Sequence, residues 1–334
     1  MKIMVTGGGG FIGSHIVRQL LQRGDTAVAV NRSSYPGLRA IGAETLQGDI
    51  RDRDFALRAC RGCDAVIHTA AKTGNLFGRF QDYYENNVAG TGNIIEACRR
   101  SGVARLVFTS SPSVVFDNRP QEGVNESHPY PRRYESPYPR TKALAEQMVL
   151  QANGRDGLLT TSIRPHIVWG PGDTQILPRL LARAKAGQIV QVGDGTNKVD
   201  MTYVEDAARA HLLALDALRE NAPAAGSAYF ISQNEPVVLW DWVRSLLKTL
   251  GLPPIARSIS LPLARIMGGA FELAYRLLPL PGEPRLTRFL ATELAVSHYY
   301  DISRARRDFG YEPQFTMDQA MEKTLPYLRG LMST

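Results

Sequence analysis

The chain has 334 residues, enough to bury a sizeable core in one large domain or two ordinary ones. Its 44% hydrophobic and 21% charged residues are typical of a soluble globular protein and exclude a disordered chain. The net charge of +7 suits an anionic ligand, but the basic residues are scattered, and we expect no nucleic-acid partner because no Lys/Arg run forms a binding stripe.

The N-terminal residues and the cysteines indicate a reducing compartment. An apolar strand pattern begins at Lys2 and leaves no room for a signal peptide, so we expect a cytoplasmic protein. Cys60, Cys63 and Cys98 are too few, and odd in number, for a disulfide framework, and are predicted to be reduced. Neither they nor the histidines have metal-ligand spacing, so no metal is expected.

Short β-branched runs alternate with helical patterns through the first two-thirds of the chain. Strands are predicted at residues 2–6, 27–31, 65–68, 105–109 and 160–164, and helices at residues 11–23 and 88–100. Repeated βαβ units predict an α/β fold, a doubly wound parallel sheet (the Rossmann arrangement) with helices on both faces.

The pattern changes beyond residue 170. A helix is predicted at residues 176–186, short strands within 188–192 and 199–204, and a strand at 228–232 that rejoins the sheet. The segment from Glu235 to the end is expected to be helical. We expect residues 1–169, with 200–233 rejoining them, to form one domain, and residues 170–199 and 234–334 to form a smaller, mainly helical C-terminal lobe.

The longest apolar stretch, residues 261–280, is interrupted by Arg265, Glu272 and Arg276. Each charge at a helix centre costs about 2.5–3.5 kcal/mol on membrane insertion, so a transmembrane helix is not expected. Two arrangements fit this pattern, an amphipathic helix that lines an apolar pocket and one that rests peripherally on a membrane surface.

A glycine-rich turn follows the first strand and opens the first helix. Residues 6–13, Thr-Gly-Gly-Gly-Gly-Phe-Ile-Gly, fit G-x-G-x-x-G from Gly8 or G-x-x-G-x-x-G from Gly7. Glycines in such a turn let backbone N–H groups and the helix N-terminus approach the pyrophosphate of a dinucleotide. The first domain is therefore predicted to bind a dinucleotide, with the pyrophosphate over Gly7, Gly10, Phe11, Ile12 and Gly13.

The residues at the end of the second strand predict whether the cofactor carries a 2′-phosphate. NAD-binding proteins place an Asp or Glu there to accept the ribose 2′-hydroxyl, whereas this chain has Asn31, Arg32 and Ser33. A guanidinium without a carboxylate favours a 2′-phosphate, so NADP(H) is the preferred cofactor and NAD(H) a second choice. The alternative is that Arg32 is a solvated surface arginine.

Tyr138 and Lys142 form a Y-x-x-x-K at the start of a predicted helix. Ser136 can cap this helix, and Pro137 and Pro139 fit its first turn. The tyrosine and the lysine are then four residues apart on one face. A nearby ammonium and the helix N-terminus should both lower the phenol pKa from ~10, as acid–base chemistry near neutral pH needs.

The glycine spacing from Gly7 and the Y-x-x-x-K, in this order, resemble the extended short-chain dehydrogenases, as do residues 87–93, 164–165 and 170–173. The resemblance covers nearly the whole chain. It implies that a hydroxyl after the fifth strand holds the reacting carbonyl, with Ser111 as the matching residue, Ser113 as the fallback and Ser110 facing the core. The further cofactor contacts that it implies are Asp49 and Ile50 at the adenine, Ala70, Ala71 and Lys72 under the cofactor, and Tyr138, Lys142, Pro165 and Ile167 near the nicotinamide.

Two positions argue against the nucleotide-sugar epimerases and dehydratases within that family. Those enzymes usually have an arginine before the aspartate that matches Asp200, and an asparagine that matches Ile167. Val199 and Ile167 cannot pair with a diphosphate. Residues 193–204, 228–232, 284–289 and 309–313 instead resemble the 3β-hydroxysteroid dehydrogenase branch, and within it the bacterial 2-alkyl-3-oxoalkanoate reductases of olefin biosynthesis.

The resemblance implies an NADPH-dependent reductase, expected as a homodimer. It would transfer hydride between the nicotinamide and an apolar β-oxo or hydroxy substrate, such as a 2-alkyl-3-oxoalkanoate or a 3-oxo or 3β-hydroxy steroid. A nucleotide-sugar epimerase or dehydratase is the alternative enzyme, and an NADP-sensing regulator the alternative from another class. His166 is expected to be a packed histidine. The C-terminal lobe, the expected substrate lobe, offers apolar residues at 261–278 and possible carboxylate partners at Lys198, Arg285 and Arg288.

Overall fold

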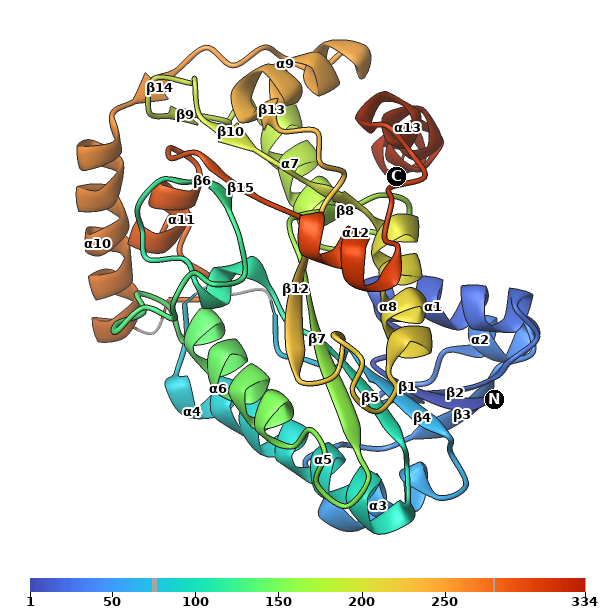
Figure 1. The fold of residues 1–334 in the computed structure, drawn as a ribbon. Coiled ribbons are helices and arrows are strands. Elements are labelled where there is room, and N and C mark those ends of the chain that lie inside the picture. Colours follow the sequence, from blue (N-terminus) through green and yellow to red (C-terminus); the bar gives the residue numbers. More distant parts are fainter. Residues whose placement is uncertain (74–76, 279, 334) are drawn as a thin grey trace.

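The computed structural model describes residues 1–73, 77–278 and 280–333 (Figure 1). A seven-stranded sheet lies at its centre in the order β12-β7-β5-β4-β1-β2-β3, with every neighbouring pair parallel. Its strands are β1 (Lys2–Thr6), β2 (Thr26–Asn31), β3 (Glu44–Gln47), β4 (Ala65–His68), β5 (Arg105–Thr109), β7 (Leu159–Pro165) and β12 (Ser227–Ile231). The strand order reverses between β1 and β4, so the predicted doubly wound sheet is confirmed.

The sheet is buried on both faces because successive apolar residues along each strand point to opposite sides. Ile3 and Val5 of β1 pack with α1 (Phe11–Gln22) and α8 (Val204–Ala217). Met4, between them, packs with α3 (Arg53–Cys60), α5 (Gly90–Ser101) and α6 (Pro137–Gln151). Figure 1 shows these two helical layers. The layers leave the carboxyl ends of the strands free to carry the candidate site.

Smaller elements complete the sheet side of the molecule. They are α2 (Pro36–Ala40), α4 (Phe80–Tyr84), a π-helical turn (Glu85–Ala89) that leads into α5, and a 3₁₀ turn (Pro112–Val114) after β5. Cys60, Cys63 and Cys98 are buried and free, which agrees with the prediction that they are reduced.

Helices and short strands beyond the sheet form the upper part of Figure 1. A four-stranded sheet, in the order β13-β10-β15-β6, joins segments that are far apart in the sequence. The strands of this part are β6 (Gln121–Val124), β8 (Val168–Trp169), β9 (Gln191–Val192), β10 (Lys198–Val199), β11 (Thr202–Tyr203), β13 (Val237–Val238), β14 (Ser258–Ile259) and β15 (His298–Tyr300). Its helices are α7 (Ile176–Lys185), α9 (Leu239–Thr249), α10 (Leu261–Leu277), α11 (Arg288–Glu293) and α13 (Met317–Ser333), whereas α12 (Ser303–Phe309) packs on β12 and α8 of the central sheet.

Predictions beyond residue 170 were confirmed only in part. The strand that rejoins the sheet is β12, and the helix after the Gly-Pro-Gly turn is α7. The short strands predicted within 188–192 and 199–204 are β9, β10 and β11, although β10 already begins at Lys198, β10 and β11 belong to different sheets, and Val204 begins α8. The segment after Glu235 is also not wholly helical, since it contributes β13, β14 and β15. The division into two lobes stays a prediction.

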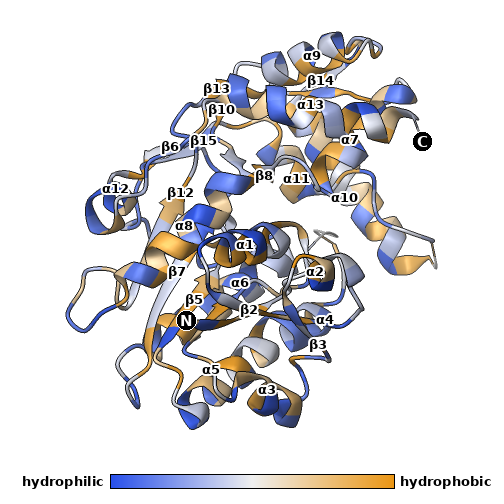
Figure 2. Cartoon of the chain, turned by 90° about the vertical axis from the view of Figure 1, so that its right-hand side faces the viewer, coloured by the Kyte–Doolittle hydropathy of each residue, from blue (hydrophilic) through white to orange (hydrophobic). Residues whose placement is uncertain are grey.

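The apolar stretch at 261–280 forms α10, which runs along the outer edge of the molecule (Figure 2). Its buried face consists of Ala264, Gly268 and Glu272, one turn apart, and packs against α11. A Cβ at Gly268 would lie 2.7 Å from the backbone of Thr287, so glycine permits this close approach. Among the described residues, no helix combines the length and hydropathy needed to cross a membrane. Residue 279 of the stretch lies outside the described residues.

Candidate active site

The glycine-rich turn between β1 and α1 is built for close backbone approach. Gly7 has a φ of +68°, which favours glycine, and a Cβ at Gly13 would lie 2.1 Å from the carbonyl oxygen of Gly7. Gly10 caps α1 without a side chain. The turn thus leaves the N-terminal N–H groups of α1 uncovered by side chains, which fits the pyrophosphate of a dinucleotide. Of the two residues between these glycines, Ile12 packs on the sheet core and Phe11 packs toward β8 and α7.

The residues after β2 divide their roles. Asn31 is buried, and its Oδ1 accepts a hydrogen bond from the Gly9 N–H at 2.7 Å, so it holds the glycine turn. Arg32 and Ser33 are exposed. Arg32 lines a cavity of about 290 Å³ together with Arg51, Lys72, Asp82, Glu85 and Asn86.

Two of the three cations in that cavity already have partners. Arg51 donates to Asp49 from Nε at 2.9 Å and from Nη2 at 2.7 Å, which lowers the pKa of Asp49. Lys72 Nζ lies 3.5 Å from Asp82. Arg32 forms no ion pair with any residue that the structure describes. Ile50 packs between α3 and α5, with its side chain facing Gly90.

Asn87 ties the segment after β4 to α6, a role that the sequence did not assign. Its Oδ1 accepts from the Lys72 N–H at 2.7 Å, and its Nδ2 donates to Lys72 O and to Thr141 Oγ1, both at 3.1 Å. On the same segment, the Ala70 N–H donates to Thr6 Oγ1 at 3.2 Å. Asn87 lies in the π-helical turn, an irregularity that is frequent at functional sites and has no clear sequence signal.

Tyr138 and Ser111 are brought together by the start of α6 and the end of β5. Ser136 caps the helix by accepting the Tyr138 N–H at 3.4 Å, and Pro137 occupies the first turn, as predicted. Ser111 acts to lower the pKa of Tyr138, and Ser113 Oγ donates to Ser111 Oγ at 3.0 Å. Ser110 is buried. Ser111 and Ser113 thus form a hydrogen-bonded pair of hydroxyls beside Tyr138.

Lys142 lies one turn further along α6 and is buried. Its Nζ donates to Thr109 O and lies 4.0 Å from the centroid of the Phe108 ring. Burial lowers the pKa of Lys142 to about 7 and raises the pKa of Tyr138 to about 12. The expected lowering of the tyrosine pKa is therefore wrong, because removal of the hydroxyl from water outweighs the lowering effect of Ser111.

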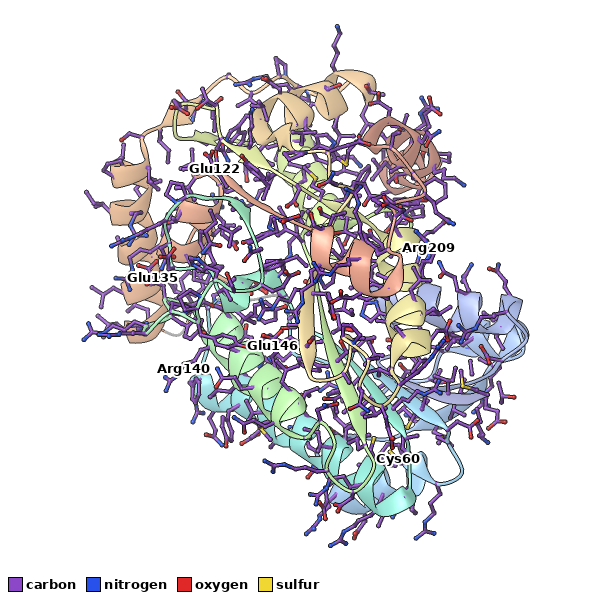
Figure 3. All side chains as sticks on the ribbon, in the orientation of Figure 1. Cys60, Glu122, Glu135, Arg140, Glu146 and Arg209 are labelled. Atoms are coloured by element: carbon purple, nitrogen blue, oxygen red, sulfur yellow. The ribbon has the colours of Figure 1, made fainter. Side chains whose placement is uncertain are left out.

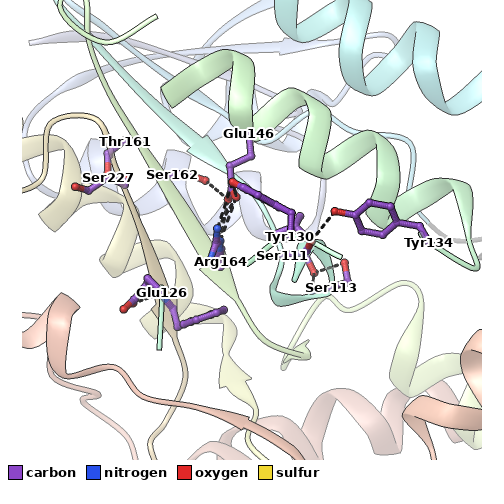
Figure 4. Close-up of polar contacts among 12 residues, drawn as sticks. Ser111, Ser113, Glu126, Tyr130, Tyr134, Glu146, Thr161, Ser162, Arg164 and Ser227 are labelled. Atoms are coloured by element: carbon purple, nitrogen blue, oxygen red, sulfur yellow. Dashed lines mark hydrogen bonds and ion pairs between the residues drawn. The ribbon is translucent and has the colours of Figure 1, made fainter. Parts of the chain in front are cut away.

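Glu146 continues the same face of α6 and anchors it to the sheet (Figure 4). It accepts hydrogen bonds from Arg164 Nη2 at 2.7 Å, from Tyr130 Oη at 2.6 Å and from Ser162 Oγ at 2.7 Å. Burial acts to raise the pKa of Glu146, but Arg164 outweighs it and the pKa is lowered. The carboxylate in turn raises the pKa of Lys142, although burial prevails there.

Glu293, the last residue of α11, is a second carboxyl that the sequence did not single out. Burial raises its pKa to about 8, and its charge acts to raise the pKa of Tyr138.

The remaining predicted nicotinamide contacts lie where β7 ends. Pro165 is the last residue of β7, and Ile167 has a φ of +38°, in the left-handed region. His166, between them, is buried and hydrogen-bonded to Asp200.

One of the three possible carboxylate partners, Arg288, is less available than expected, whereas Lys198 and Arg285 are exposed. Arg288 donates to Glu272 from Nε at 3.0 Å and from Nη2 at 2.8 Å, so its guanidinium is already paired. Arg265 pairs with Glu135 at 2.7 Å, which fastens α10 to the segment before α6 (Figure 3). Val199 is fully buried and contributes to an apolar cluster, as its residue type suggests.

A doubly wound sheet with a glycine turn after β1 and a serine–tyrosine–lysine group after β5 and on α6 defines a nicotinamide-dependent oxidoreductase of the extended short-chain dehydrogenase type. The chain belongs to the 3-beta hydroxysteroid dehydrogenase/isomerase family, whose model matches residues 4–263. It acts as an NAD(P)-dependent oxidoreductase on CH–OH groups, as its relatives named as reductases and dehydrogenases do.

Two relatives and one solved structure illustrate the proteins to which the chain is similar. A 2-alkyl-3-oxoalkanoate reductase of Stenotrophomonas maltophilia (strain K279a) is 46% identical over 97% of this chain and 98% of its own length. A 3 beta-hydroxysteroid dehydrogenase/Delta 5-->4-isomerase of Mycobacterium tuberculosis (strain ATCC 25618 / H37Rv) is 38% identical over 98% of this chain and 90% of its own. The structure of MoeE5 in complex with UDP-glucose and NAD superposes with a TM-score of 0.75 at 26% identity, covering 99% and 100% of the two chains.

Proposed function

We propose that the chain is an NADPH-dependent reductase of apolar β-oxo substrates. The observation that carries this proposal is the placement of Ser111, whose hydroxyl acts on the pKa of Tyr138, beside Tyr138 and Lys142, which lie one turn apart on α6. Ser111 hydrogen-bonds the substrate carbonyl and Tyr138 gives it a proton from Oη, while a bound nicotinamide supplies the hydride. Because its pKa is about 12, Tyr138 keeps its proton at neutral pH, which suits a proton donor and hence the direction of reduction.

Lys142 has a supporting role in this proposal. Its amine lies at the carboxyl end of β5, bonded to Thr109 O, and gains a proton readily once a negative charge forms nearby. A phenolate left on Tyr138 after proton transfer is such a charge, and an ammonium on the same helix face stabilises it. Tyr138 and Lys142 would also contact the cofactor, as would Pro165 and Ile167 at the nicotinamide and Ala70, Ala71 and Lys72 beneath it.

The preference for NADPH rests on the cavity beside Arg32. Arg51 and Lys72 have carboxylate partners there, whereas Arg32 has none among the residues described. An unpaired guanidinium favours a 2′-phosphate over a 2′-hydroxyl. Asp49 would take part less directly than expected, since its carboxylate is held by Arg51.

The substrate that we favour is a long-chain 2-alkyl-3-oxoalkanoate. The relative at 46% identity is named for that reaction, and the relative at 38% for a steroid reaction, so a bulky apolar ketone is common to both. A nucleotide sugar, as bound by MoeE5, is the alternative. It is disfavoured because buried Val199 and apolar Ile167 offer nothing to a diphosphate.

The exposed face of α10 supports a further part of this proposal, peripheral contact with a lipid surface that holds the apolar substrate. Ile266 is 70% and Leu277 is 72% exposed, so these side chains neither line an enclosed pocket nor pack on the sheet. The exposed large apolar residues of the segment are Leu263, Ile266, Met267, Leu273, Leu277, Leu278 and Leu280. Arg276 on the same helix and the net charge of +7 suit an anionic lipid surface.

We also propose that the protein is cytoplasmic and forms a homodimer. Light scattering would check the homodimer.

One assay tests the substrate proposal. NADPH oxidation is measured with 3-oxo acids of increasing chain length, a 3-oxosteroid and a UDP-sugar under the same conditions. Each buried methylene is worth about 0.8 kcal/mol, so kcat/KM should rise with acyl length until the site is filled. Turnover of the UDP-sugar alone, or no gain with chain length, would refute the proposed substrate.

A further inference from the structure

Two buried histidines link the end of β7 to α11 through an unbroken chain of hydrogen bonds. His166 Nδ1 lies 2.6 Å from Asp200 Oδ1, His166 Nε2 lies 3.0 Å from His298 Nδ1, and His298 Nε2 lies 2.9 Å from the backbone oxygen of Glu293. Asp200, His166 and His298 are all buried. Each of the four ring nitrogens therefore faces one hydrogen-bonding partner.

The number of protons in this chain follows from its geometry. The two ends, the carboxylate of Asp200 and the carbonyl of Glu293, can only accept hydrogen bonds. Three links between them need three hydrogens, whereas two neutral imidazoles supply only two, one each. Any arrangement with two hydrogens leaves two acceptors facing each other at hydrogen-bond distance, which is costly in a buried site. The chain therefore holds one additional proton, shared between Asp200 and His166, while His298 stays neutral with its hydrogen on Nε2.

The surroundings agree with this distribution. Burial lowers the pKa of His298 to about 3, so His298 stays neutral. Tyr300 on β15 packs its ring against His166. The charged groups that act on the pKa of Tyr300 are Asp200 on the β10–β11 turn, the Glu293 carboxyl at the end of α11, Arg164 and Asp117. The short 2.6 Å contact between His166 and Asp200 is typical of a charge-assisted hydrogen bond.

The chain borders a strained turn. Ile167 has a φ of +38°, rare for a β-branched residue, and such strain persists only where the surroundings impose it. Thr202 clamps the turn, since its Oγ1 donates to His166 O at 2.7 Å and accepts the His166 N–H at 3.1 Å. The imidazole of His166, fixed by Asp200 and His298, is the second restraint on the same residue.

We propose that Asp200, His166 and His298 form a proton-holding clamp that positions the Ile167 turn against the nicotinamide. This inference rests on the proposed function, because the nicotinamide contact of residues 165–167 is assigned there. The three side chains are positioning residues: with every ring nitrogen engaged, they touch neither the reacting carbonyl nor the hydride. Loss of a hydrogen-bonding partner on either side of the His166 imidazole, or of the additional proton, releases the strain at Ile167 and misplaces the turn.

The proton count is tested on the wild-type protein alone. Nitrogen NMR of 15N-histidine-labelled protein, assigned with single His→Asn variants, reports how many ring nitrogens carry hydrogen. At pH 7.5 we expect hydrogens on both nitrogens of His166, unless the proton rests on Asp200, and on Nε2 alone of His298. Carbonyl-labelled aspartate distinguishes these two positions of the proton. One hydrogen on each imidazole together with an ionised Asp200 would overturn the proposal.

The positioning role is tested with conservative variants of His298. His298→Asn keeps an acceptor for His166 Nε2, whereas His298→Phe removes both hydrogen bonds. We expect His298→Phe to lower kcat at least 10-fold and to weaken NADPH binding, measured by nicotinamide fluorescence, while His298→Asn stays within about 3-fold of wild type. His128→Asn is the matched control, because His128 is not part of the hydrogen-bonded chain of Asp200, His166 and His298.

Two other results have distinct meanings. Lower thermal stability in every variant with unchanged kcat and cofactor affinity would show that the chain is merely structural and overturn the positioning role. Wild-type protein that binds neither NADPH nor NADH would instead reject the proposed function, while the NMR measurement still decides the proton count. The variants that fold poorly are excluded by their circular dichroism, and the wild-type NMR result does not depend on them.

Discussion

The carboxylate of Glu146 lies 2.7 Å from the guanidinium of Arg164, and both side chains are buried between α6 and the sheet. The pair therefore fixes α6, and with it Lys142 one turn away. Removing one partner of a buried pair leaves the other charge unpaired and typically costs about 3–5 kcal/mol. We expect Arg164→Leu to lower the unfolding free energy by this amount in urea titrations.

A double variant and a surface pair control this prediction. Arg164→Leu combined with Glu146→Leu should be more stable than Arg164→Leu alone, because no charge then remains buried. Arg100→Ala, which breaks the exposed pair with Glu96, should cost at most about 1 kcal/mol. Similar losses for Arg164→Leu and Arg100→Ala would contradict the role of the buried pair.

Tyr138→Phe should remove the proton donor without disturbing the fold. A positioned acid contributes about 10²–10⁴ in rate, so kcat should fall by at least 100-fold while thermal stability and NADPH affinity stay near wild type. Tyr134→Phe is the control, since its hydroxyl donates to Val114 O rather than to Ser111. Turnover of Tyr138→Phe within 10-fold of wild type would rule out this mechanism.

Arg32→Ala tests the cofactor preference. Loss of a charge-assisted bond to the 2′-phosphate should cost about 1.5–3 kcal/mol, so kcat/KM for NADPH should fall about 10- to 150-fold while the value for NADH changes little. Arg58→Ala, an exposed arginine on α3, should leave both values unchanged. Equal kcat/KM for NADH and NADPH in the wild type would reject the preference.

Gly13→Ala tests the close approach at the glycine turn. The added Cβ would lie 2.1 Å from Gly7 O, so the turn or the start of α1 must shift, and we expect destabilisation at the upper end of the usual 1–3 kcal/mol for overpacking, ~3 kcal/mol. Cofactor affinity should fall at least 10-fold. Gly37→Ala, where nothing lies within 4 Å, should be neutral in both measurements. Unchanged NADPH binding in Gly13→Ala would contradict the prediction that the glycine turn contacts the cofactor.

Glu293 should make stability depend on pH. Its pKa is raised from 4.5 to about 8 in the folded protein, so the folded state holds a proton that the unfolded state has lost between these values. The unfolding free energy contributed by this group is thus fully present below pH 4.5 and falls by up to about 1.4 kcal/mol per pH unit as the pH rises toward 8. The stability of Glu293→Gln does not fall in this way. The difference between its melting temperature and that of the wild type should therefore shift in favour of the variant as the pH rises from 5 to 8. Parallel melting curves across that range, as expected for exposed Glu122→Gln, would contradict the assignment.

The sequence predicted the central sheet well because its strands are short, β-branched and buried on both faces, as Ile3, Met4 and Val5 illustrate. It predicted short strands within residues 199–204 but not that β10 and β11 belong to different sheets. There the buried carboxylate of Asp200 accepts the Tyr300 N–H at 3.1 Å, a partner that lies 100 residues away and ends the strand. Local patterns cannot reveal such a contact.

The candidate site was predictable to a similar extent. Spacing predicts that Tyr138 and Lys142 share a helix face, but the direction of their pKa shifts depends on burial, which the tertiary structure decides. The outward face of α10 shows the same limit, since an amphipathic pattern gives the contrast between two faces but not which of them the protein covers. Ile266 and Leu277 are exposed although they are the apolar residues.

The position of β12 in the sheet has a consequence for synthesis on the ribosome. β7 ends at Pro165, but its outer neighbour β12 begins only at Ser227, so β7 has one open edge until that segment emerges. At about 5–20 residues per second, this interval lasts several seconds. Exposed strand edges invite pairing with other chains, and charged or weakly hydrophobic residues counter it. Thr160, Thr161, Ser162 and Arg164 therefore make β7 a poor template for aggregation while the nascent chain waits for its last strand.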